Sequence, residues 1–270
     1  MEHLIPQMVD AISTRKSRRN FLSDPLQESD EEKVRKFLKI LDPPFEHSVE
    51  VTLHELPEKT SIFNFKGQNK VHLFASLRAP DQIEEAAKLG FVGELFILYC
   101  VSLGIGTCWI GRYKKKNTYQ VVYGTPEERG SKKLFCIIPL GYCPEKRSLI
   151  EKLSNKVFSS RRKPVEKKLH EDSLKDFPEH IGETLELARW APSAMNCQCW
   201  YFKVSEEQNL VIVEVSKPPG YKYWRWNYSE IDVGTSASHV WLGLKNQGVS
   251  FDTSIEEDVE RIVWKFIIDK

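Results

Sequence analysis

The sequence has 270 residues, of which 41% are hydrophobic and 29% charged, and its 39 basic and 38 acidic side chains leave a net charge of +1. This composition is that of a folded globular protein, and the balanced charge argues against a general affinity for nucleic acid or a membrane surface. The six cysteines form no Cys-x-x-Cys pair and the N-terminus lacks an apolar signal segment. We therefore expect a cytoplasmic protein with reduced thiols.

In chain order, the patterns predict helices at residues 4–13, 31–41 and 179–189, and strands at 47–56, 71–77, 134–140, 200–204, 210–215 and 263–268. The apolar segment 95–110 is too short for a typical membrane span and is interrupted by Gly104, so it predicts a buried helix that ends near Leu103. We expect residues 263–268 to close the sheet. Residues 112–132 are polar and show no clear period.

A basic run follows the first predicted helix. It places cations around one hydroxyl at Arg15, Lys16, Ser17, Arg18 and Arg19. Guanidinium groups and a serine hydroxyl are suited to a phosphate dianion, because charge-assisted hydrogen bonds are strong and directional. The alternative is a solvated surface or a nucleic-acid patch. A second basic run contains Arg161 and Arg162.

The stretch Ala191-Pro192-Ser193-Ala194-Met195-Asn196-Cys197-Gln198-Cys199-Trp200 has the composition of a loop that approaches a flat polar ring. Proline fixes its own backbone, and small residues let main-chain N–H groups come close to a ligand. The alternative is an ordinary helix-to-strand turn capped by Ser193. A zinc site at Cys197 and Cys199 is disfavoured, because the chain has no second clustered pair to complete it.

The chain repeats itself at a spacing of 144 residues. This shift places Gly90 on Gly234 and Gly104 on Gly248, and it superposes apolar residues of 96–105 on those of 240–249. The two basic runs agree with the same shift to within two residues. A spacing this long predicts two copies of one unit rather than a solenoid. We expect a first copy at 1–157 and a second, shorter copy at 158–270, interlocked as one globular unit.

Two motifs of the chain resemble signatures of the FMN-dependent nitroreductase family. The first is the set Arg15, Lys16, Ser17 and Arg19, and the second is the segment from Pro192 to Trp200, with Cys199 where proline is usual. In that family the second motif follows the first by about one helix, whereas here residues 41–48 stand in its place and lack it. Each half has kept the motif that the other lost. This matches an internally duplicated branch of the family, in which one polypeptide imitates the homodimer.

The resemblance implies an α+β fold in which a central antiparallel sheet is flanked by helices, with one FMN at the contact between the copies. It implies FMN phosphate contacts from Arg15, Lys16, Ser17, Arg19 and either Arg161 or Arg162. It implies contacts to the flavin ring from Pro192, Ser193, Ala194, Asn196, Asn64, Lys66, Ile110 and Gly111. A surface loop explains Lys66 equally well.

Residues 218–228 hold five aromatic rings and two cations. With Trp109, the rings of Tyr221 and Trp224 are candidates for stacking on nicotinamide or on an aromatic substrate. The alternative is that these rings fill the contact between the two copies.

The function implied by the resemblance is hydride transfer from NAD(P)H through FMN to a nitroaromatic, a quinone or a similar small acceptor. The flavin carries the chemistry, so no protein side chain is assigned as catalytic and no metal is required. The alternative is a flavin-binding or degenerate pseudoenzyme with a regulatory or interaction role. The duplication implies a monomer, with no nucleic-acid or membrane partner.

Overall fold

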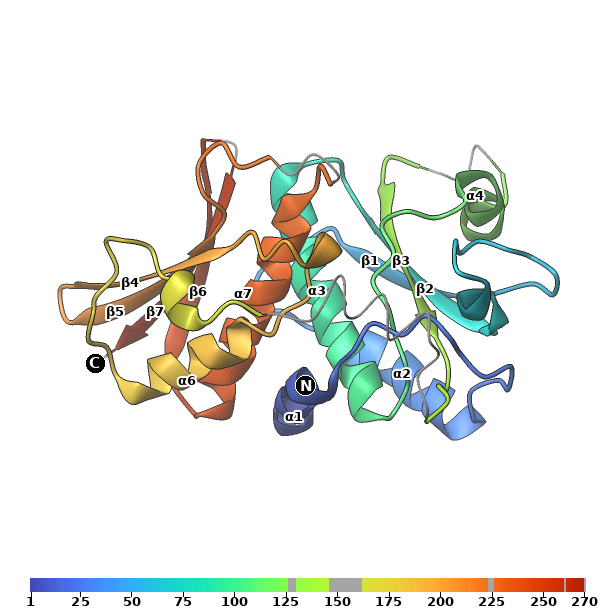
Figure 1. Cartoon of the computed structure of the whole chain (residues 1–270), viewed down its shortest axis with the longest axis horizontal. Coiled ribbons are helices and arrows are strands. Elements are labelled where there is room, and N and C mark those ends of the chain that lie inside the picture. Colours follow the sequence, from blue (N-terminus) through green and yellow to red (C-terminus); the bar gives the residue numbers. More distant parts are fainter. Residues whose placement is uncertain (126–129, 146–161, 223–225, 260, 270) are drawn as a thin grey trace.

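Two long helices cross at the centre of the molecule, and an antiparallel sheet lies on either side of them (Figure 1). The structure is a computed structural model that describes residues 1–125, 130–145, 162–222, 226–259 and 261–269. The main elements are α1 (Ile5–Thr14), α2 (Glu28–Ile40), β1 (Glu50–Glu55), β2 (Leu73–Ala79), α3 (Ile83–Ser102), α4 (Lys115–Tyr123), β3 (Lys133–Leu140), α6 (Glu179–Ala188), β4 (Tyr201–Glu207), β5 (Leu210–Ser216), α7 (Ser229–Asn246), β6 (Phe251–Asp258) and β7 (Arg261–Asp269).

The two sheets repeat one topology. The first has the strand order β1-β2-β3 and the second has the order β4-β5-β7-β6, with every pairing antiparallel. In each half, two paired strands precede a long buried helix, α3 or α7. A third strand, β3 or β7, follows this helix and pairs with the second strand. One element is inserted between the helix and the third strand, and it is α4 in the first half and β6 in the second. The expected α+β fold with two related copies is confirmed, and the strands divide into one sheet per copy.

The close crossing of α3 and α7 depends on two glycines that the sequence repeat pairs. A Cβ atom on Gly90 would collide with the main-chain oxygen of Ile231, and one on Gly234 would collide with that of Ala87. Ala87 and Ile231 are themselves 144 residues apart. The contact is therefore reciprocal, as at a two-fold interface between identical subunits.

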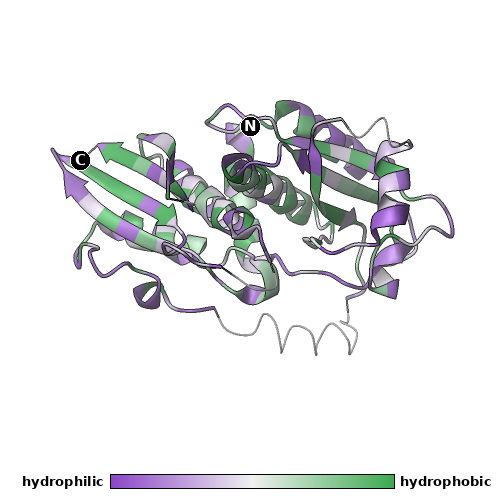
Figure 2. Ribbon diagram, turned by 90° about the horizontal axis from the view of Figure 1, so that it is seen from above, coloured by the Kyte–Doolittle hydropathy of each residue, from purple (hydrophilic) through white to green (hydrophobic). Residues whose placement is uncertain are grey.

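Both central helices are buried on all sides and end in the same way. Residues 85–100 of α3 and 229–244 of α7 are continuously buried, which is typical of helices at the centre of a core. Gly104 and Gly248 follow the two helices with φ angles of +78° and +70°, a conformation that glycine adopts without steric cost. One apolar core runs through both halves, and hydrophobic residues concentrate on the strands and on the helices between the sheets (Figure 2).

The other predicted helices and strands agree with the structure to within a few residues. The buried helix predicted within 95–110 does end near Leu103, but α3 begins earlier, at Ile83, and no range was predicted for α7. Two further differences concern the second sheet and α4. The expectation that residues 263–268 close the sheet is wrong, because β7 lies between β5 and the unpredicted edge strand β6. β6 is mostly polar and only partly buried, so its sequence lacks the alternation of apolar residues from which a strand is predicted. The segment 112–132 contains α4, which the sequence did not predict.

The expected copy boundary at 157/158 lies outside the described residues. Among the helices of the described part, we find none that is long and apolar enough to cross a membrane.

Candidate functional site

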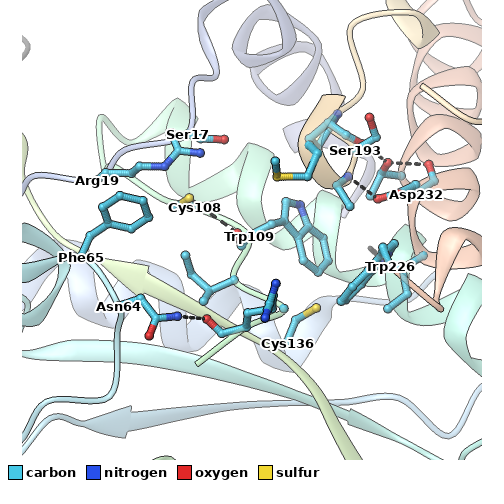
Figure 3. Close-up of a pocket in the computed structure, with 18 residues that line it drawn as sticks. Ser17, Arg19, Asn64, Phe65, Cys108, Trp109, Cys136, Ser193, Trp226 and Asp232 are labelled. Carbon is cyan, nitrogen blue, oxygen red and sulfur yellow. Dashed lines mark hydrogen bonds between the residues drawn. The ribbon is translucent and has the colours of Figure 1, made fainter. Parts of the chain in front are cut away.

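A pocket of about 470 Å³ lies where the two halves meet (Figure 3). The first half contributes Ser17, Arg19, Asn64, Phe65, residues 108–112 and Cys136. The second half contributes residues 192–195, Trp226, Ile231, Asp232 and Thr235. The wall thus includes part of each sequence motif, although the motifs are separated by more than half of the chain.

The segment after α1 places a hydroxyl and a guanidinium on the pocket wall. The chain becomes extended at Arg15, whose ψ angle is 127°, and Ser17 then pairs with Thr107 in an isolated parallel bridge. The N–H of Arg18 donates to the carbonyl of Thr107 at 2.8 Å. In an extended chain alternate side chains share a face, so Ser17 and Arg19 both reach the pocket. The Arg19 guanidinium lies over the ring of Phe65, 5.6 Å from its centre.

The other two residues of this motif lie outside the pocket wall. Arg15 is nearly buried, and its Nε atom lies 3.6 Å from Oε1 of Glu94. Lys16 is exposed to solvent. Arg15 is thus part of an internal ion pair, and the pocket lining gives no support to a ligand contact from Arg15 or Lys16.

Trp109 is held on the pocket wall by α3, through a hydrogen bond to a carboxylate that α7 also contacts. Its Nε1–H donates to Oε2 of the fully buried Glu94 at 2.8 Å. The other carboxylate oxygen lies 3.2 Å from Nε2 of His239, whose Nδ1 lies 3.1 Å from the carbonyl oxygen of Leu187. A Cβ on Gly93 would collide with the Trp109 ring. Glu94 and His239 therefore position the indole from opposite halves.

The loop after α6 presents Pro192, Ser193, Ala194 and Met195 to the pocket. Two contacts with α7 fix its beginning. The N–H of Ala194 donates to Oδ1 of Asp232 at 2.9 Å, and the hydroxyl of Thr235 donates to the carbonyl of Pro192 at 2.8 Å.

The same loop has an unusual backbone. Met195, Asn196 and Gln198 have φ angles of 53°, 57° and 48°. Left-handed conformations at residues other than glycine cost on the order of 1–2 kcal/mol each, and they concentrate at ligand-binding sites. The N–H of Gln198 donates to the hydroxyl of Ser193 at 2.9 Å, which closes the turn.

Asn196 does not line the pocket. Its Oδ1 accepts a hydrogen bond of 2.7 Å from Nη1 of Arg162, so the two predicted ligand residues bind each other instead. Burial lowers the pKa of the Arg162 guanidinium to about 10. The pair fastens the loop to the segment that enters the second half. Arg161 lies outside the described residues.

Asn64, Ile110 and Gly111 line the pocket, whereas Lys66 is exposed and lies off the wall. The Asn64 amide donates to the carbonyl of Arg112 at 2.6 Å. Ile110 exchanges two main-chain hydrogen bonds of 3.0 Å with Ile137 of β3, which fixes the backbone of this wall.

The aromatic segment contributes one residue that the sequence did not single out. Trp226 lines the pocket and packs on Gly111, where a Cβ would overlap the indole ring. Tyr221 does not line the pocket, and Trp224 lies outside the described residues. Trp226 belongs to the same aromatic run, so the aromatic composition of residues 218–228 could have identified it as a pocket residue.

Asp232 and Thr235 were also missed. They lie one turn apart on α7 beside Gly234, and both face the pocket. Burial raises the pKa of the Asp232 carboxyl well above its usual range. The thiols of Cys197 and Cys199 lie next to this carboxyl, and the three form the one group of potential metal ligands found among the described residues.

The contact of Gly111 with Trp226 leads to a testable prediction. Gly111→Ala should lower the free energy of unfolding by about 1–3 kcal/mol, because the added methyl group overlaps the indole. In a Trp226→Ala background the same substitution should cost less than about 0.5 kcal/mol. Urea denaturation of the four proteins measures both values. Equal costs in the two backgrounds would show that the ring does not pack on Gly111.

Comparison with known proteins agrees with this architecture. The family model described as "Putative TM nitroreductase" matches residues 7–244 of the chain. The search of curated proteins found no match to the chain.

Solved structures that resemble this chain include a putative nitroreductase from Thermotoga maritima. It is 21% identical, with a TM-score of 0.64, and the alignment covers 97% of this chain and 94% of that one. An FMN-dependent nitroreductase from Clostridium difficile is 18% identical with a TM-score of 0.40, over 51% of this chain and 88% of its own. A nitroreductase family protein from Clostridium difficile 630 is 13% identical with a TM-score of 0.44, over 62% and 98%.

The family model spans most of the chain, and the Thermotoga maritima structure shares its fold from end to end. The chain therefore belongs to the nitroreductase family that this model describes.

Proposed function

We propose that this protein is an FMN-dependent oxidoreductase that takes hydride from NADH or NADPH and passes it to a nitroaromatic, a quinone or a similar small acceptor. Membership of the nitroreductase family indicates an oxidoreductase. The observation that carries the finer proposal is the pocket between the halves, where Ser17 and Arg19 from one motif meet residues 192–195 from the other.

The pocket fits a flavin nucleotide in size and in the distribution of its polar groups. Its volume of about 470 Å³ lies within the usual range for cofactor sites. Ser17 and Arg19 provide a hydroxyl and a guanidinium for a phosphate, and Figure 3 shows both at some distance from the loop of Ser193. Gly111 lacks a Cβ, so the ring of Trp226 packs directly against its backbone and closes this wall.

The residues that would hold FMN are a subset of those predicted from the sequence. Ser17 and Arg19 would bind the phosphate, and the wall segments 110–111 and 192–194 with Asn64 would border the ring. Lys66 and Asn196 are assigned no contact, because their side chains lie off the pocket wall. When bound, FMN supplies hydride transfer between a nicotinamide donor and an acceptor.

The chain's own contribution is to position flat molecules and to exclude water. Trp109, Ile110, Met195 and Trp226 give the pocket apolar walls. Trp109 is fixed by its hydrogen bond to Glu94, so it offers a preformed surface for an aromatic ring. Such walls favour planar aromatic acceptors over flexible polar ones.

The proposal is tested with the FMN-loaded protein under anaerobic conditions. Mixing with NADH or NADPH should remove the visible absorbance of the flavin, and adding a nitroaromatic or a quinone should restore it. A protein that binds FMN but is reduced by neither nucleotide would be a flavin-binding pseudoenzyme. A protein that binds no FMN would be the degenerate form, and either result would refute the proposed activity.

The assembly state is a second expected outcome. The reciprocal contact of α3 with α7 already buries the surface that a homodimer would use, so we expect a monomer. Light scattering in dilute solution should give the mass of one chain, 31.3 kDa. A mass near twice that value would contradict the prediction.

A further inference from the structure

Two cysteines and an aspartate form a buried cluster beside the pocket. Cys197 and Cys199 follow the pocket loop, and Asp232 lies on the first turns of α7. The two sulfur atoms and a carboxylate oxygen of Asp232 all lie within 4.8 Å of one another. Cys199 and Asp232 are buried, and Cys197 is partly buried.

The local backbone brings both sulfur atoms toward the aspartate. Cys197 is in a right-handed helical conformation (φ −65°, ψ −28°), and Gln198 follows with a φ of 48°. The resulting tight turn is stabilised by a neighbouring segment, because Oε1 of Gln198 accepts a 2.8 Å hydrogen bond from the N–H of Lys163. The carbonyl of Gln198 also accepts a hydrogen bond from the buried Lys168 ammonium. The cysteine pair is therefore preformed.

The two oxygens of the aspartate have different partners. Oδ1 accepts the hydrogen bond from the N–H of Ala194, and Oδ2 accepts one from the thiol of Cys197, with 3.5 Å between oxygen and sulfur. A cation would take the place of that thiol proton. A tetrahedral zinc ion with one sulfur and one oxygen ligand places these two atoms about 3.5 Å apart, given the usual zinc–ligand bond lengths. Metal-binding carboxylates are commonly fixed in this way by an outer hydrogen bond.

We propose that Cys197, Cys199 and Asp232 form a binding site for a thiophilic divalent cation, Zn²⁺ in the first place, with the fourth position open to water. Two sulfurs and one carboxylate oxygen are a ligand set that zinc accepts. The site goes beyond the proposed oxidoreductase activity and does not depend on it. Because Ala194 connects Asp232 to the pocket loop, a bound ion would also make that loop more rigid.

Three side chains that can each carry a negative charge lie together in this cluster, and two of them, Cys199 and Asp232, are buried. Protons or a cation must therefore offset any charge that the cluster carries.

A disulfide between Cys197 and Cys199 is the competing interpretation of the same pair. It would need an oxidant and would leave Asp232 without a role in the cluster. The third ligand group favours the cation. The two possibilities differ in a measurable way, because a disulfide removes both thiols and with them the metal affinity.

The test uses the reduced full-length chain, freed of metal by a chelator, with its flavin content recorded. Titration with Co²⁺ should give one equivalent per chain, with the visible bands of a tetrahedral ion and a thiolate charge-transfer band. The visible bands of tetrahedral Co²⁺ lie at longer wavelength than oxidised flavin absorbs. Zn²⁺ should then displace Co²⁺ and bleach these bands.

Variants assign the ligands. Cys197→Ser, Cys199→Ser and Asp232→Asn should each weaken Zn²⁺ binding more than about 100-fold in competition with a chromogenic chelator, beyond the effect typical of outer-shell residues. Cys108→Ser is the matched control, because Cys108 is also a buried thiol at the pocket but lies outside the cluster. It should bind Zn²⁺ like the unaltered protein.

The unaltered protein alone can overturn the proposal, so the outcome does not depend on the folding of variants. Failure to bind Co²⁺ or Zn²⁺ at stoichiometric concentrations would refute it. A Cys197–Cys199 disulfide that persists in the presence of Zn²⁺ would also refute it. Mass spectrometry would reveal this disulfide as a chain two hydrogen atoms lighter than the reduced one. Binding that survives Cys197→Ser and Cys199→Ser in folded protein, judged by circular dichroism, would refute the ligand assignment.

Discussion

Arg19→Ala is expected to weaken FMN binding by about 2–3 kcal/mol, roughly 30- to 150-fold, while riboflavin binding stays unchanged. Arg19 lines the pocket next to Ser17 and would leave a phosphate charge poorly paired when removed. Riboflavin has no phosphate, so its affinity should not change when Arg19 is removed. Quenching of flavin fluorescence measures both affinities.

The neighbouring lysine provides the control for this prediction. Lys16 belongs to the same basic run but is exposed and lies off the pocket wall. Lys16→Ala should therefore change FMN affinity only slightly, through long-range charge that added salt screens. If both variants lost affinity equally, the basic run would attract the phosphate without a specific contact from Arg19.

Gly234→Ala and Gly90→Ala should each destabilise the fold by at least about 3 kcal/mol, at the upper end of the range for overpacking. In both variants the new methyl group would meet a main-chain oxygen of the opposite central helix, which cannot move aside as a flexible side chain does. The reciprocal geometry also predicts similar costs for the two substitutions. Urea denaturation followed by circular dichroism measures them.

Gly182→Ala is the matched control on α6. A Cβ at Gly182 would meet only the Phe177 ring, at an ordinary contact distance of 3.7 Å. Alanine is a better helix former than glycine, so this variant should gain about 0.5–1 kcal/mol. Equal and small effects at all three glycines would mean that α3 and α7 do not cross closely.

The architecture was largely predictable because it depends on local patterns that the duplication displays twice. The buried helices α3 and α7 share a pattern of apolar residues and end before Gly104 and Gly248, and both features are repeated at one spacing. The strand β6 was not predictable in this way. It lies at an edge, faces solvent on much of its length and pairs only with β7, so no alternation reveals it.

The candidate site was predictable only where the backbone presents a motif directly to the pocket. Ser17, Arg19 and residues 192–195 reach the wall, whereas Arg15 and Asn196 are drawn away by Glu94 and Arg162. Those partners are distant in sequence, so motif spacing cannot reveal them. Asp232 was missed for the same reason, because its contacts arise only when the loop meets α7.

The central claim is that one flavin site is built from both halves of the chain. Its most direct test is to saturate the protein with FMN, remove the excess, denature it and count the released flavin against protein. The account predicts one FMN per chain, since the two motifs occur once each in complementary halves. Two equivalents would show a second working site, and none would show that the pocket does not hold the cofactor.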